Sequence, residues 1–175
     1  EDVEVRKSAL AALAVAKDPA GLDVIVTRLE RGEDDERLMA LGALGNLHTP
    51  EATEALAAQL AGLDSIIARN AALLLALQGD ERAEPFITSM LDRGTYGDDP
   101  AMASPLRAQL DESSRSSVVA AATEQFLVLA CKAAVDLGSE AAVPALRVLH
   151  ETDPSLKVKS AAIDALHDLG AVTES

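Results

Sequence analysis

The sequence predicts an all-α fold built from a pair of helices that recurs about every 31 residues, the repeat period. A basic residue followed by an Ala- and Leu-rich run marks one helix of each copy, and this marker occurs at Arg6, Arg37, Arg69 and Lys159. The first three markers follow one another at nearly equal intervals. Because so short a unit cannot bury its apolar face alone, we expect about four to five helix pairs to stack within one domain, residues 1–175.

The turn inside each copy follows the same spacing. Pro, Gly, Asp and Thr end one helix and begin the next at residues 16–19, 47–50 and 78–81. The next helix carries an apolar doublet and a later Leu, the spacing of one buried helical stripe: Val24 and Ile25 with Leu29, Ala55 and Leu56 with Leu60, Phe86 and Ile87 with Leu91. We expect the glycines that follow to cap these helices at their C-termini, at Gly32, Gly62 and Gly94.

The repeat is interrupted by an irregular insertion at about residues 95–117, which is rich in Gly, Pro, Asp and Ser. A short helix is predicted over 102–110, and the repeat resumes at Val118. The next helix follows from Ala141, and the last spans about 155–169. A long insertion in a repeat array is either a functional or a mobile loop.

The composition indicates what the core consists of and where in the cell the protein is expected. Because 49% of the residues are hydrophobic but only 2% are aromatic, the core must consist of Ala and Leu. No segment has the roughly 18 uninterrupted apolar residues of a membrane span, so we expect no membrane contact. Cys131 is the only cysteine, which excludes an intrachain disulfide and favours a reducing, cytoplasmic location. The chain opens without an initiator Met or a signal peptide, so we expect it to be a fragment of a longer protein.

The formal net charge is −14. A polyphosphate backbone would be repelled by this charge, so nucleic acid is not expected as a ligand. Two interpretations stay open. The charge keeps an Ala-rich protein soluble, or it attracts a basic protein or peptide partner.

The helix pair resembles the HEAT-repeat family, above all the short bacterial type first noted in phycobilisome-lyase-like proteins. The resemblance lies in the basic marker before an Ala/Leu helix and in the Ala-x-Pro-x-Leu-like start of the other helix, at residues 2–6, 68–72, 156–162 and 140–146. It covers the chain apart from the insertion. It implies a right-handed alpha-alpha superhelix, a HEAT-like solenoid whose second helices line the concave side, and a role as a scaffold or protein-binding surface.

The basic markers Arg6, Arg37, Arg69 and Lys159 have two interpretations. A stripe of cations would attract an acidic peptide or a phosphate group. Each cation, however, follows acidic residues at a turn, and such pairs tie neighbouring helical repeats together. We favour this structural inter-repeat ladder over a ligand-binding stripe.

The insertion supplies the candidate partner-binding residues Tyr96, Asp98, Asp99 and Arg115. Tyr is favoured at protein interfaces, and Tyr96 stands in an acidic loop that we expect to be exposed. The alternative is a solvated loop anchored by one ring. Two adjacent aspartates supply too few oxygen ligands for calcium.

The sequence contains no recognisable catalytic constellation, and its three histidines are far apart or at helix ends. We therefore predict no enzymatic activity, cofactor or metal. The predicted function is a non-enzymatic protein–protein interaction scaffold. Two alternatives stay open: a bilin-lyase-like or chaperone-like enzyme of the phycobilisome-lyase type, and a structural spacer or oligomerisation array.

Overall fold

The computed structural model describes residues 3–62, 65–97 and 111–171. Every regular element in this part of the chain is helical, which confirms the all-α prediction. The α-helices are α1 (Val3–Ala16), α2 (Leu22–Arg31), α3 (Asp34–Leu47), α4 (Pro50–Ala58), α5 (Ser65–Leu77), α6 (Glu84–Met90), α7 (Glu112–Asp136), α8 (Val143–Thr152) and α9 (Leu156–Asp168). Short 3-10 helices join them: η1 (Pro19–Gly21), η2 (Gln59–Ala61), η3 (Glu81–Ala83), η4 (Arg93–Tyr96) and η7 (Glu140–Ala142).

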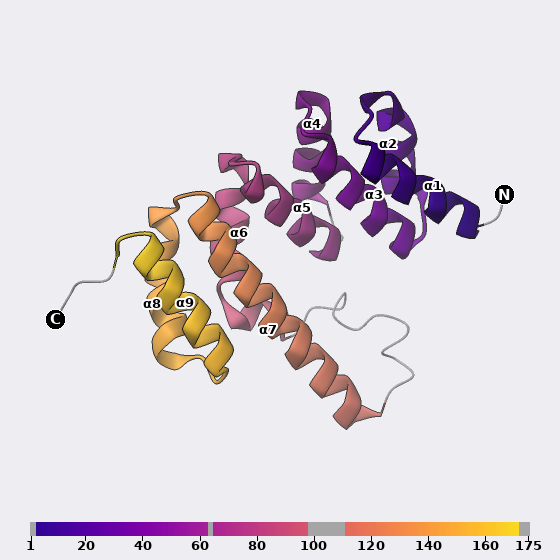
Figure 1. Cartoon of the computed structure of the whole chain (residues 1–175). Coiled ribbons are helices and arrows are strands. Elements are labelled where there is room, and N and C mark those ends of the chain that lie inside the picture. The colour runs from indigo at the N-terminus through magenta and orange to yellow at the C-terminus, as the bar shows by residue number, and fades with distance from the viewer. Residues whose placement is uncertain (1–2, 63–64, 98–110, 172–175) are drawn as a thin grey trace.

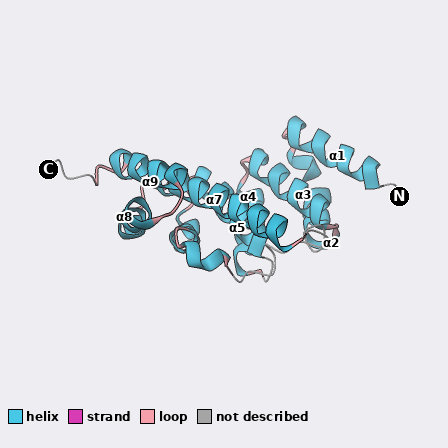
Figure 2. Ribbon diagram, turned by 90° about the horizontal axis from the view of Figure 1, so that it is seen from below, coloured by secondary structure: helices cyan, strands magenta, loops and turns pink. Residues whose placement is uncertain are grey.

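The helices follow one another along the molecule, from α1 at one end to α8 and α9 at the other (Figure 1). Each odd-numbered helix packs against the next odd-numbered one, as α1 does against α3 and α3 against α5. Helices α4 and α6 pack against both odd-numbered helices that flank them in the chain, whereas α2 packs against α3 and α8 against α9. The view from below shows the same order along the molecule (Figure 2).

A left-handed residue ends each of the helices α1, α3, α5 and α7 and gives the repeat its structural period. Lys17, His48, Gly79 and Gly138 have φ angles of 51°, 53°, 73° and 62°. The first three follow one another at one repeat period, and the interval from Gly79 to Gly138 is longer because the interruption lies between them. The next residue in each case is an N-cap whose side chain accepts a backbone N–H: Asp18, Thr49, Asp80 and Ser139.

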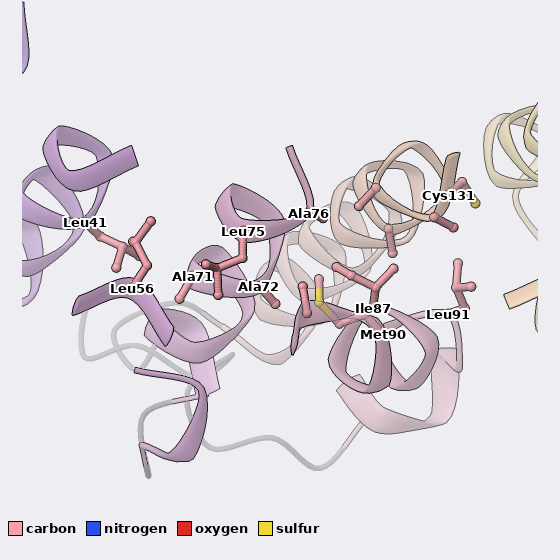
Figure 3. Packing of buried hydrophobic residues seen from close by; sticks show 14 of the residues in the cluster. Leu41, Leu56, Ala71, Ala72, Leu75, Ala76, Ile87, Met90, Leu91 and Cys131 are labelled. Carbon is pink, nitrogen blue, oxygen red and sulfur yellow. The ribbon is translucent and has the colours of Figure 1, made fainter. Parts of the chain in front are cut away.

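The core repeats with the same spacing. Each even-numbered helix has a completely buried aliphatic side chain at the same position of the repeat, at Ile25, Leu56, Ile87 and Leu146. In the middle of the molecule, Leu41 of α3 points towards Leu56 of α4, and Ile87 and Met90 of α6 lie beside the helix that carries Cys131 (Figure 3). These residues belong to one continuous buried cluster, which accounts for the folding of helices too short to be stable alone.

The predicted C-caps are correct at two of three glycines. Gly32 ends α2 and Gly62 ends η2, whereas α6 already ends at Met90 and Gly94 lies inside η4. The side chain of Asp92 accepts the backbone N–H of Gly94, and this bond starts a new turn there.

Gly32 and Gly42 form a matched pair for a test of stability. A Cβ added at Gly32 would lie 2.5 Å from the carbonyl oxygen of Arg28 and 2.9 Å from the Cβ of Glu36, whereas nothing lies within 4 Å of one added at Gly42. We expect Gly32→Ala to lower the free energy of unfolding by about 1–3 kcal/mol. Gly42→Ala in the middle of α3 should raise it by about 0.4–1 kcal/mol. Urea unfolding measures both, and equal effects would contradict the close approach at Gly32.

The boundaries of the interruption also differ from the prediction. Helix α7 begins at Glu112, ahead of the predicted restart at Val118, because Asp111 caps it by accepting the backbone N–H of Ser114. Residues 98–110, with the predicted short helix at 102–110, lie outside the described residues. Within the described chain, α7 alone is long and apolar enough to cross a bilayer by length and composition. It packs against α5, α6 and α9, and its buried residues all lie from Thr123 onward.

Candidate functional site

Tyr96 is the residue whose position differs most from the prediction. It ends η4 with only 1% of its surface exposed, so the prediction that its ring is exposed is wrong. Its hydroxyl donates a hydrogen bond of 2.8 Å to the carbonyl oxygen of Met90, and its ring stacks on Phe126 of α7 with the centroids 6.0 Å apart. Burial raises the pKa of the phenol, which stays neutral. Tyr96 therefore anchors the start of the interruption to the core.

Arg69 of α5 completes this cluster. Its guanidinium lies over the Tyr96 ring at 4.6 Å and over the Phe126 ring at 5.9 Å, both within the range of a cation–π contact. It also donates to the carbonyl oxygen of Thr95. Phe86 lines a depression together with Arg69, so the only tyrosine and both phenylalanines of the chain gather beside one arginine.

The depression beside Arg69 is open to solvent and has a volume of about 240 Å³. Leu60, Phe86 and Met90 give it an apolar wall, and Ser65, Ser89 and Thr95 supply hydroxyl groups. Because it is open, it does not enclose a ligand.

A second open depression of about 340 Å³ lies where η4 meets α8. Its polar edge is a bidentate ion pair in which Arg93 donates to the two carboxylate oxygens of Asp153 at 2.7 and 2.8 Å. The Asp153 side chain is 1% exposed and that of Arg93 is 32% exposed. Burial by itself raises the pKa of Asp153, but hydrogen bonds from Arg93 and the Ser155 amide outweigh it and hold the pKa below its ordinary value. This pair joins residues 60 positions apart across the interruption.

The predicted basic ladder divides into different kinds of contact. Arg6 pairs with Glu36 of the next helix pair, and this hydrogen bond together with that of the Glu33 amide holds the pKa of Glu36 below its ordinary value. Arg37 instead donates to the carbonyl oxygen of Leu29, 8 residues earlier. Lys159 donates to the carbonyl oxygen of Glu151, also 8 residues earlier. Arg37 and Lys159 thus bond to the C-terminal end of the preceding helix, where a cation is favoured by the helix dipole.

The other residues singled out in the interruption are placed only in part. Asp98 and Asp99 lie outside the described residues, and Arg115 lies half-buried near the start of α7. Sequence reasoning missed Phe126 and the Arg93–Asp153 pair. The scarcity of aromatic residues was the only sequence feature that set Phe126 apart, and it does not say which residues the ring contacts.

The described residues contain no group of three or more His, Cys, Asp and Glu side chains placed to hold a metal ion. Cys131 is 1% exposed, and burial raises its pKa to about 12, so its thiol stays protonated at neutral pH and is a poor nucleophile. No family model matches the sequence, and a comparison with curated proteins finds no match either.

Proposed function

We propose that the chain is a non-enzymatic protein–protein interaction module, built as a short HEAT-like superhelix of stacked helix pairs. The left-handed residue, N-cap and buried aliphatic side chain recur at one repeat period before the interruption and once more after it, and this recurrence supports the architecture. Such an array stabilises each pair through its neighbours and leaves long helical surfaces exposed to a partner.

The proposal rests on the exposure of the first half of α7. None of residues 112–122 is buried, whereas Thr123 and Leu127 further along the helix are fully packed. Figure 1 shows this half running out beyond the ends of α6 and α9. Val118 is 37% exposed there, with exposed alanines at 120 and 121. Val119 and Ala122 pack partly against the core, so it is the other side of this half, with Val118 and Ala121, that offers an apolar strip to another protein.

The electrostatics favour a basic partner. The net charge of −14 attracts cationic proteins and accelerates their association. The two depressions described above are open to solvent, and their polar groups are mostly bonded to the protein itself, as in the Arg93–Asp153 pair. Such surfaces suit contact with a partner better than turnover of a small molecule.

Affinity capture with matched variants tests the proposal. The intact chain serves as bait against lysate, and the affinity of each captured protein is then measured with purified components. Val118→Glu with Ala121→Glu alters the exposed strip of α7, and Leu77→Glu places a charge on α5 at a residue 62% exposed. We expect the α7 variant to weaken a saturable, 1:1 interaction at least tenfold and the α5 control to leave it unchanged. Equal affinity for both variants, or no saturable partner, would refute the proposal.

A further inference from the structure

The N-terminal end of the helix array is unusually open. Helix α1 is 14 residues long but buries only Leu10, whereas α3, of the same length, buries residues along its whole span. Helix α1 packs mainly against α3 on one side. Its opposite side carries Val5, Ala9 and Ala12, all exposed, with Val5 at 58%.

The same three positions are buried in the next helix pair. One repeat period after Val5, Ala9 and Ala12 come Glu36, Ala40 and Ala43, which are 1%, 0% and 0% exposed. Glu36 receives its ion pair from Arg6 in the preceding pair, so this side of α3 faces the preceding pair. A further period along, Ile67 and Ala71 of α5 are 3% and 0% exposed.

Helix α2 shows the same pattern independently. Val24 is 52% exposed, but its equivalent two periods along is Phe86, which is half-buried. Phe86 lines the 240 Å³ depression together with Leu60, which belongs to the preceding pair. Both helices of the first pair therefore expose the side that the internal pairs use to contact the pair before them.

We propose that this N-terminal end face, made of Val5, Ala9, Ala12 and Val24, binds a further helix pair of the same repeat type. The proposed interface uses the same side of the helices as the internal interfaces between α1 and α3 and between α3 and α5. Its small side chains let the helices approach closely.

A second copy of this chain fits the end face less well. A copy stacked head to tail would bring α9 onto it, and the exposed side of α9 carries Asp164, His167 and Asp168. Burying these charges against Val and Ala is costly. Two copies meeting through α1 would each bring a net charge of −14.

A fusion to the intact chain tests the proposal. A copy of residues 32–62 is placed directly before residue 1, and its length of one repeat period keeps the array in phase. We expect one cooperative unfolding transition, a higher urea midpoint, and amide exchange in α1 slowed at least tenfold. The same fusion to a chain carrying Val5→Glu and Ala9→Glu should neither raise the urea midpoint nor slow amide exchange in α1. That double variant without the fusion should keep the parent's urea midpoint, because both side chains are exposed.

Three results would overturn the proposal. The first is a fusion that does not raise the urea midpoint, and the second is a fusion that raises it equally in the double variant. The third is a parent chain that sediments as a dimer, where Val5→Glu and Ala9→Glu dissociate the dimer. The last result would assign the end face to a second copy of the chain. None of these results depends on the α7 surface or on its partner.

Discussion

Tyr96→Ala is expected to lower the free energy of unfolding by about 3–5 kcal/mol, the cost of deleting a large buried aromatic side chain. The substitution removes the stacking on Phe126, the contact with the Arg69 guanidinium and the hydrogen bond to Met90. Tyr96→Phe keeps the ring and loses only the hydrogen bond, so it should cost about 1 kcal/mol. Equilibrium unfolding in urea, followed by circular dichroism, measures both values.

Leu156→Ala is the control for this measurement. Leu156 is 83% exposed, and its truncation should change the free energy of unfolding by less than about 0.5 kcal/mol. If Tyr96→Ala cost no more than Leu156→Ala, Tyr96 would not be an anchor of the core and its assignment to a partner surface would regain support.

Asp153→Asn is expected to lower the free energy of unfolding by about 3 kcal/mol at neutral pH. Removing one charge of a buried pair leaves the other without its partner, at a cost of about 3–5 kcal/mol. The lower end of that range applies because the Arg93 side chain keeps 32% of its surface in water. Glu54→Gln breaks an exposed pair with Arg82 and should have a much smaller effect, because water screens both of its charges.

The stability that the Arg93–Asp153 pair contributes is expected to fall as the pH is lowered. The pKa of Asp153 is lower in the folded chain than its ordinary value of 3.8, so the folded state favours the carboxylate. The pair therefore contributes fully above the unfolded pKa and is lost as pH falls through the folded pKa. The difference in stability between the parent chain and Asp153→Asn should be constant above roughly pH 5 and shrink towards roughly pH 3. A difference that grows on acidification would contradict the assigned pair.

The repeat could be predicted from the sequence because it depends on local rules. Turn residues, N-caps and apolar spacing act within a few residues, so the helix order and the buried Ile25, Leu56 and Ile87 follow from pattern alone. The C-caps at Gly32 and Gly62 are local in the same way.

The contacts made by residues at the interruption could not be predicted in the same way. Tyr96 has polar, loop-forming neighbours in the sequence, but its burial depends on Phe126 and Arg69, each about one repeat period away on another helix. The Arg93–Asp153 pair likewise depends on how the chain returns after the interruption. Contacts between distant residues have no local signature, so exposure was predicted where the fold buries the ring.

Distances between spin labels at equivalent positions of successive pairs test the stacked array most directly. Val15, Asn46, Leu77, Asp136 and His167 are exposed and occupy one position of the repeat, so each can be labelled as cysteine with Cys131 replaced by alanine. We expect similar distances for 15–46 and 46–77, and distances from position 15 that increase at 46, 77, 136 and 167 in turn. A distance from 15 to 167 no longer than that from 15 to 46 would contradict the stacked array.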